Sequence, residues 1–296
     1  MNSTPADAVA PSVLAHSRWD AIPVMAGIGH VALIGAFVLL IDRLPWWGVI
    51  GAGLLYAYLI AWNINGVAHN FIHNPYFRAA WLNRVYSVML SLTMGFSQVM
   101  YNWVHTRHHF GNMDRPGADG NTVDPISIYR FGANGAAENV WSYTFKSYWR
   151  DDPAQIYRQI AAKSPREARF ALVELACVIG VYGGLTMVNW RAVVVMAPFY
   201  YIGHSLSSLV GYYEHFRANP DAPIAWGVSC YGRLYNLVWL NNGYHAEHHF
   251  RPRLHWTRMK AYHREIAAHQ REAGVRVIGW PHFLGFLAAS RSDPRR

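Results

Sequence analysis

Charge and cysteine are both scarce in this chain of 296 residues. Asp, Glu, Lys and Arg together make up 15% of it, against roughly 25% in a typical soluble domain. Its two cysteines, Cys177 and Cys230, form neither a disulfide framework nor a zinc-type cysteine pair. These absences exclude a disulfide-stapled scaffold and a thiolate metal site, and they argue against an ordinary soluble domain.

The N-terminal stretch lacks the basic start and apolar run of a secretory signal. We expect residues 1–20 to form a polar lead-in instead. Residues 1–296 are expected to form a single domain that includes this lead-in. In this division residues 256–296 make up a C-terminal tail.

Long apolar runs dominate the rest of the chain, in which hydrophobic residues reach 52%. A membrane-spanning helix needs about 20 predominantly apolar residues. Four segments meet that length, at 22–41, 46–68, 170–188 and 191–213. The connections within each pair are very short, so each pair predicts a helical hairpin. We therefore expect an all-α integral membrane protein with four transmembrane helices in two hairpins that enter from the same side.

A fifth apolar segment, residues 85–104, is weaker because Ser, Thr, Gln and Asn interrupt it. It is expected to be an interfacial or buried helix rather than a span. If it crossed the membrane, the histidine clusters on either side of it would face opposite compartments.

The basic residues fall almost entirely on one predicted side. Only Arg43 and Arg191 lie in the two short hairpin turns, and the other 24 of the 26 Lys and Arg residues share the side of both termini. Positive charge marks the cytoplasmic face of membrane proteins. The net charge of +9 is thereby explained without a nucleic-acid partner, and we expect the termini to be cytoplasmic in a bacterial inner membrane.

Histidine is abundant, and nine of the sixteen histidines form an ordered pattern. The clusters read "HNFIH", "HTRHH", "GYYEHF" and "HAEHH", and they supply His69, His73, His105, His108, His109, His215, His245, His248 and His249. By the predicted topology all nine reach the same face of the membrane. Imidazole is the commonest protein ligand for zinc, copper, iron and nickel. Since one such ion takes four to six ligands, nine imidazoles suit two ions. The residues alone leave iron, copper and zinc open.

These clusters, in this order and with these gaps, resemble the three histidine boxes of the membrane fatty acid desaturase/hydroxylase superfamily. The resemblance covers roughly residues 60–255 and includes the hairpin topology. "GYYEHF" is similar to the Glu–His segment of integral-membrane alkane hydroxylases. The resemblance implies a di-iron centre held by the nine histidines on a cytoplasmic helical cap, where O₂ and two external electrons oxidise an unactivated C–H bond.

The same resemblance implies a fatty acyl chain or similar apolar compound as substrate. Desaturation is the primary hypothesis and hydroxylation the alternative, which "GYYEHF" favours. No electron-transfer domain is fused to the chain, so electrons are expected from a separate ferredoxin, rubredoxin or cytochrome type protein. Two hypotheses from other classes are a histidine-gated metal transporter and a structural zinc protein. The transporter is disfavoured because eight of the nine histidines lie in loops or at helix ends.

Several polar residues are candidates to support the ligands, because metal-bound imidazoles usually donate their other N–H group to a carboxylate or carbonyl. The carboxylates considered are Glu214, Glu247, Asp114 and Asp124. Solvated or helix-capping roles are the alternative for each of them.

Two asparagines and one further histidine complete the candidate site. Asn241 or Asn242 could hold a water at the metal, or could cap a helix. His204 lies three turns before the "GYYEHF" histidine, deep in the fourth apolar segment. It could contact substrate or could be a hydrogen-bonded core residue.

Residues 258–272 predict a basic amphipathic helix on the cytoplasmic surface. Its charge would suit either anionic lipid headgroups or an acidic electron donor.

Overall fold

The computed structural model describes residues 12–110 and 122–289. Within these ranges the chain forms helices and no β-strand, with isolated bridges joining Leu14 to Phe77 and Ser229 to Val277. The predicted all-α class is confirmed.

The first hairpin consists of α1 (Ala21–Leu40) and α2 (Trp46–Trp62), preceded by η1 (Arg18–Asp20) and joined by η2 (Ile41–Arg43). No charged residue occurs within α1. At 1.5 Å per residue its 20 residues span about 30 Å, the thickness of the bilayer core. Three helical segments of the described chain are long and apolar enough to cross a membrane, namely Arg18–Arg43, Trp46–His73 and Pro165–His215.

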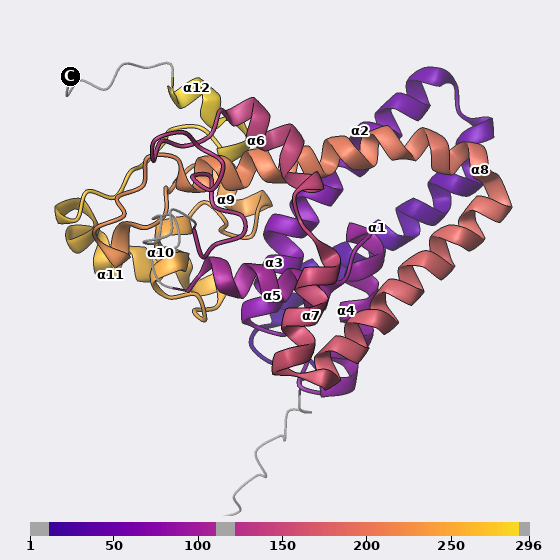
Figure 1. Cartoon of the computed structure of the whole chain (residues 1–296), viewed down its shortest axis with the longest axis horizontal. Coiled ribbons are helices and arrows are strands. Elements are labelled where there is room, and N and C mark those ends of the chain that lie inside the picture. Colours follow the sequence, from indigo (N-terminus) through magenta and orange to yellow (C-terminus); the bar gives the residue numbers. More distant parts are fainter. Residues whose placement is uncertain (1–11, 111–121, 290–296) are drawn as a thin grey trace, which may run out of the picture.

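The third of these segments is α8 (Pro165–His215), which contains both the third and the fourth predicted span. Asn189 interrupts it with non-helical dihedral angles, φ −155° and ψ 87°. The Asn189 Oδ1 atom accepts from the backbone N–H of Ala192 at 3.2 Å, as an N-cap residue does, while its Nδ2 atom donates to Asp42 at 2.8 Å. The helix is thereby divided into two arms whose bend meets the turn of the first hairpin (Figure 1).

Close packing fixes α2 against the second arm of α8. A Cβ atom added at Gly203 would lie 2.7 Å from the Ala57 carbonyl oxygen, and one added at Gly53 would lie 2.4 Å from the Phe199 ring. Small residues that let helix backbones approach are typical of membrane-helix interfaces.

The segment expected to be one helix over 85–104 is instead two, and that prediction is wrong. Helix α4 (Ala80–Met94) ends at Gly95, whose φ of 75° is left-handed, and α5 (Gln98–His108) begins after Ser97, whose side chain accepts from the Met100 N–H. A left-handed glycine and a serine N-cap are strong stop and start signals. They override the apolar pattern that runs through the turn.

Both arms of α8 hold this α4–α5 turn. From the first arm, the carboxylate of Glu174 accepts from Ser97 Oγ at 2.6 Å and from the Val99 N–H at 3.0 Å. From the second arm, Tyr200 donates its hydroxyl to the Met94 carbonyl at 3.0 Å. The turn is therefore fixed between the arms.

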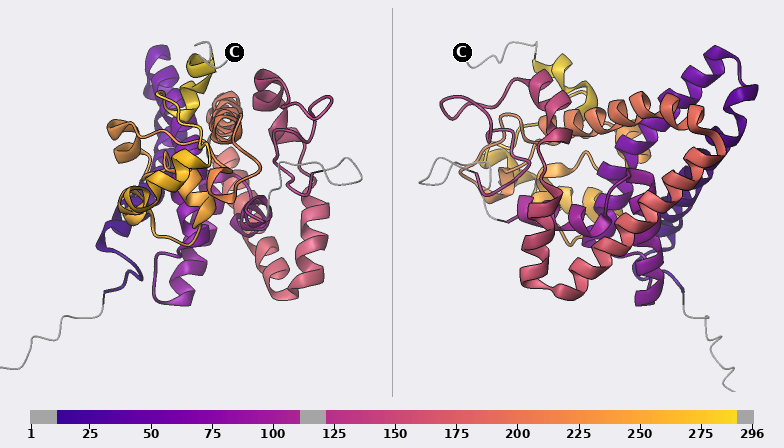
Figure 2. Two further views of the ribbon diagram at one scale, coloured as in Figure 1. Left: turned by 90° about the vertical axis from the view of Figure 1, so that its left-hand side faces the viewer. Right: turned by 45° about the vertical axis from the view of Figure 1, so that its right-hand side comes forward.

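The remaining short helices gather at the end of the molecule opposite the α8 bend, as Figures 1 and 2 show, apart from α7, which lies beside α5. Their bounds are α6 (Val140–Lys146), η4 (Ser147–Trp149), α7 (Pro153–Lys163), η5 (Pro223–Ala225), α9 (Arg233–Val238), α10 (His245–Phe250), η6 (Trp256–Arg258), α11 (Met259–Glu272), η7 (His282–Leu284) and α12 (Gly285–Ala289). The helix predicted over 258–272 is confirmed as α11.

Candidate metal centre

A π-helical segment, η3 (Asn63–Ala68), joins α2 to α3 (His69–His73). Its wider turns leave carbonyl groups that side chains from neighbouring segments bind. Tyr101 donates to the Ile64 carbonyl at 3.1 Å, and Tyr76 donates to the Val67 carbonyl at 2.7 Å. Single π-turns often occur at functional sites. Here the segment sets the direction in which the first histidine pair leaves the helix.

The second and third histidine clusters lie at the end of α5 and along α10. Helical positions i, i+3 and i+4 share one face, so each cluster presents three rings to the interior. The histidines fall into two groups of possible ligands. In each of these clusters the histidines at positions i and i+4 belong to one group, and the histidine at position i+3 belongs to the other. The interleaving explains why both clusters have the same spacing.

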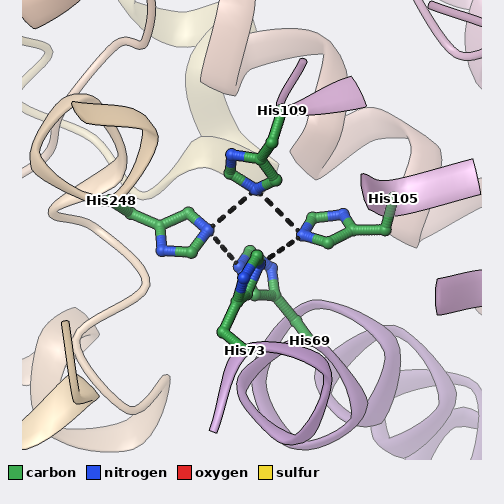
Figure 3. A group of neighbouring side chains, drawn as sticks. All are labelled: His69, His73, His105, His109 and His248. Carbon is green, nitrogen blue, oxygen red and sulfur yellow. Dashed lines mark hydrogen bonds between the residues drawn. The ribbon is translucent and has the colours of Figure 1, made fainter. Parts of the chain in front are cut away.

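The first group contains His69, His73, His105, His109 and His248. Their Nε2 atoms face a common point, as Figure 3 shows. The nitrogen–nitrogen distances are 2.7 Å from His69 to His248, 2.8 Å from His73 to His105, and 3.0 Å from His109 to both His105 and His248.

These distances fit a shared ion better than a set of hydrogen bonds. A neutral ring nitrogen carries either one hydrogen or one lone pair, yet His105 Nε2 lies within 3.0 Å of two other Nε2 atoms. Nitrogens bound to one ion at about 2.1 Å and at right angles would lie about 3.0 Å apart. An ion that accepts every lone pair satisfies the whole group.

The second group contains His108, His215, His245 and His249, all of them buried. The Nε2 atoms of His215 and His245 are 3.0 Å apart. The buried Nε2 atom of His249 has no hydrogen-bond partner, which is a costly state unless an ion occupies the space in front of it. The ring of His249 also stacks on His109 of the first group, with centroids 4.2 Å apart, so the two groups are adjacent.

Burial favours the neutral imidazole in five of the ligand histidines that lie outside the apolar spans. It lowers the pKa of His105, His109, His245, His248 and His249 well below the ordinary value of 6.5, and the neighbouring histidines lower it further. A metal ligand must offer a lone pair, which only the neutral ring has. These histidines therefore offer lone pairs to a cation at neutral pH.

The sequence profile of one family, described as fatty acid desaturase, matches residues 44–280. The chain belongs to the fatty acid desaturase family. That membership implies a membrane-bound oxidoreductase, and the resemblance carried by the histidine clusters is confirmed. Members of the family are typically iron-dependent. No individual curated protein matches the chain significantly.

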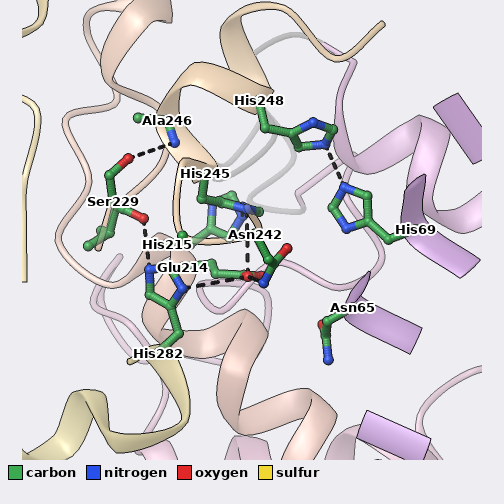
Figure 4. Close-up of polar contacts among 12 residues, drawn as sticks. Asn65, His69, Glu214, His215, Ser229, Asn242, His245, Ala246, His248 and His282 are labelled. Atoms are coloured by element: carbon green, nitrogen blue, oxygen red, sulfur yellow. Dashed lines mark hydrogen bonds and ion pairs between the residues drawn. The ribbon is translucent and has the colours of Figure 1, made fainter. Parts of the chain in front are cut away.

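In this desaturase-family chain, two carboxylates lie behind the second group. Asp124 Oδ2 is 2.7 Å from His108 Nδ1, so it fixes the ring of this member of the second group. Glu214 lies 3.7 Å from His245 Nδ1 and accepts from Asn242 Nδ2 at 2.7 Å. Figure 4 shows Glu214 and Asn242 beside His245 and His215. These three of the predicted supporting residues adjoin the histidines.

The other supporting candidates have different roles. The Glu247 carboxylate forms hydrogen bonds with Ser229, Tyr231 and His263. These bonds connect α10 to neighbouring segments. The Asn241 side chain donates to the Trp256 carbonyl at 2.9 Å. Asp114 lies outside the described residues.

His204 is a hydrogen-bonded core residue. Its Nε2 atom is 3.0 Å from the Met94 carbonyl oxygen, and its ring packs on Phe96, Tyr148 and Tyr200. These contacts place it at the α4–α5 turn, which it helps to hold.

Two buried polar residues were not recognised in the sequence, one beside the second histidine group and one at the α4–α5 turn. His282 is fully buried, 3.8 Å from Glu214 and hydrogen-bonded to the Val228 carbonyl; as an isolated histidine it offers no pattern. Glu174 did carry a signal, because a carboxylate inside an apolar span is costly and usually has a role.

Proposed function

We propose that this chain is a non-haem di-iron enzyme that oxidises an unactivated C–H bond of a fatty acyl chain or a similar apolar substrate. Desaturation is the primary reaction and hydroxylation the second candidate. The observation that carries the proposal is the division of nine imidazoles into groups of five and four with adjacent rings. A structural zinc site needs four ligands and closes around one ion, whereas this arrangement suits two ions.

Two bound iron ions would supply the activation of O₂. In a desaturation, two hydrogen atoms leave the substrate, and with two electrons, two protons and O₂ they yield two water molecules. In a hydroxylation, one oxygen atom enters the substrate and the other leaves as water with the same two electrons and two protons. Both reactions require an electron donor, which we propose is a separate electron-transfer protein.

The residues of the chain hold and shield this centre. The first group would bind one ion and the second group the other, with Asp124 fixing the ring of His108. The four buried rings of the second group keep bulk water away from one side of the centre. Exclusion of water protects an oxidising site from side reactions.

Hydroxylation is retained as a candidate because His215 belongs to the second group. This histidine comes from the Glu–His segment that resembles the alkane hydroxylases. The position of a ligand does not fix the fate of the substrate, so the product has to be measured.

The proposed topology has four crossings, with the two arms of α8 as the third and fourth. It is supported by the length of Pro165–His215, 51 residues, which is more than twice the roughly 20 residues that one crossing needs. The distribution of Lys and Arg supports cytoplasmic termini and a cytoplasmic metal centre in a bacterial inner membrane. We further propose that residues 1–296 form one domain.

Metal analysis and product analysis test this function together. The purified chain is expected to hold about two irons, as nine imidazoles suit two ions, and mass spectrometry of lipids from expressing cells should show a loss of two hydrogens or a gain of one oxygen. His248→Ala should lower the iron content and abolish product. His269→Ala, at an exposed position on α11, is the control and should retain both. Zinc without O₂ consumption in the presence of reductant would refute the proposal.

A further inference from the structure

Basic residues predominate on α11 and the segment that precedes it. Between residues 251 and 272 there are six Lys or Arg residues and two acidic residues, Glu265 and Glu272. All six basic residues are exposed. The basic face is defined as Arg251, Arg253, Arg258, Lys260, Arg264 and Arg271.

This basic face is tied directly to the metal centre. The His263 Nδ1 atom of α11 is 2.6 Å from the carboxylate of Glu247 in α10, and Figure 1 shows the two helices side by side. Arg251 and Arg253 follow His249, the last histidine of the third cluster, by two and four residues. A protein bound to this face would therefore lie beside the histidine clusters.

The two metal groups differ in their access to the surface. His73 and His109 of the first group are half-buried, whereas every histidine of the second group is buried. The first group is consequently the more accessible of the two, and we expect electrons to enter through it.

The basic face does not have the character of a membrane-embedded helix. A helix that lies in the bilayer interface exposes apolar side chains to lipid, but α11 exposes no large hydrophobic residue and buries Met259 against the protein. By contrast, α9 exposes Leu234 at 74% and Leu237 at 78%. If a short helix of this end enters the bilayer surface, α9 is the suitable one.

We propose that the basic face docks an acidic one-electron carrier protein that reduces the metal centre through the first histidine group. This inference rests on the proposed di-iron function. Each docking event would transfer one electron, so that the carrier would be oxidised by one electron and one iron held by the histidine groups would be reduced from ferric to ferrous. Two successive events supply the two electrons of the reaction.

The test measures anaerobic reduction of the iron-loaded protein in stopped flow, so that it needs no knowledge of the substrate. The probes are a reduced acidic [2Fe–2S] ferredoxin and, separately, dithionite. The test variant is K260E/R264E, whose positions are four residues apart on the exposed side of α11. The matched control is R158E/R166E, at exposed positions in α7 and the first turn of α8.

K260E/R264E is expected to lower the second-order rate constant with ferredoxin about ten-fold or more at low ionic strength. The difference should shrink to less than about two-fold in 0.5 M NaCl, where surface charges are screened. The control and the wild type should remain alike, and dithionite should reduce all three proteins equally.

An unchanged ferredoxin rate in K260E/R264E would overturn the docking proposal and would favour binding of lipid headgroups by the basic face. An equal loss in the control would overturn it too, because the effect would then follow net charge. If dithionite itself failed to reduce the wild-type centre, the di-iron function would be wrong instead.

Discussion

His108 is held by a buried carboxylate. Its Nδ1 atom lies 2.7 Å from the Asp124 carboxylate, and the residue belongs to the second metal group. The carboxylate selects one tautomer and one ring orientation, since it accepts the Nδ1 hydrogen. The ligand therefore does not have to be ordered when the ion binds.

Asp124→Asn is expected to weaken metal binding about 10- to 100-fold. The neutral amide loses the charge, and its single oxygen can replace only one of the two Asp124 oxygens, which accept from His108 and from the Ile126 N–H group. Competition with an iron chelator measures the effect. Asp152→Asn is the control, because an asparagine there can still accept from the Ala154 and Gln155 N–H groups that Asp152 caps. Equal iron retention in the two variants would contradict the assigned role of Asp124.

His282 should make stability depend on pH. Burial lowers its pKa from 6.5 to about 3, so below pH 6.5 the unfolded chain binds a proton that the folded chain does not. The free energy of unfolding should then fall as pH falls, by up to about 1.4 kcal/mol per pH unit for this group. In His282→Gln the neutral amide lacks this contribution, and the decrease between pH 6.5 and 5 should be smaller.

Thermal unfolding in detergent at several pH values measures this difference. His269→Gln, at an exposed position, should keep the wild-type pH dependence. Parallel curves for wild type and His282→Gln would show that the residue is not buried as a neutral ring.

At the scale of elements, the direction of the second histidine cluster depends on how α5 begins. Glu174 of α8 accepts from Ser97, from the Val99 N–H and from Ser87. It thereby fixes the start of α5, whose other end carries His105, His108 and His109. A carboxylate buried in a membrane helix thus has a structural reason to be there.

Glu174→Ala should destabilise the protein by about 3 kcal/mol, because it leaves buried donors without an acceptor. It should also lower the iron content, whereas Glu174→Gln, which keeps one carbonyl oxygen, should be milder. Thermal midpoints and metal analysis measure both effects. Glu167→Gln is the matched control, since the Arg84–Glu167 pair is partly exposed and contributes less than about 1 kcal/mol. A wild-type iron content in Glu174→Ala would rule out a positioning role.

At the scale of the whole molecule, the bend of α8 and the turn of the first hairpin meet at one end, and α10, which carries the third histidine cluster, lies toward the other (Figure 1). The helices between them are apolar enough to cross a membrane. The molecule therefore separates a lipid-embedded part from the part that holds the metal groups and the basic face.

Cysteine labelling tests the orientation of this arrangement. In a C177S/C230S background, Arg43→Cys and Arg191→Cys should react with an impermeant maleimide from the periplasmic side. Lys260→Cys should react only in inverted vesicles. All three positions are exposed. Labelling of Arg43→Cys and Lys260→Cys from the same side would exclude the proposed topology.

Helix content, membrane character and family were predictable because they depend on local and repeated features. Length and apolarity identify a span, and the spacing of "HTRHH" and "HAEHH" places three rings on one helix face. The boundary between α4 and α5 was harder to predict from the sequence. It depended on Gly95 and Ser97, two residues inside an apolar run, and on contacts from α8.

The sequence by itself determined which residues carry imidazole and that their helices share one side. Only the tertiary structure decided how the nine rings divide into two groups. The first group combines the first cluster, His105 and His109 of the second cluster, and His248 from a helix that is distant in the sequence. The tertiary structure also decided that Asp124 and Glu214 lie behind the ligands while Glu247 braces α11. Such pairings depend on how helices approach one another in space, and residue spacing along the chain does not encode that approach.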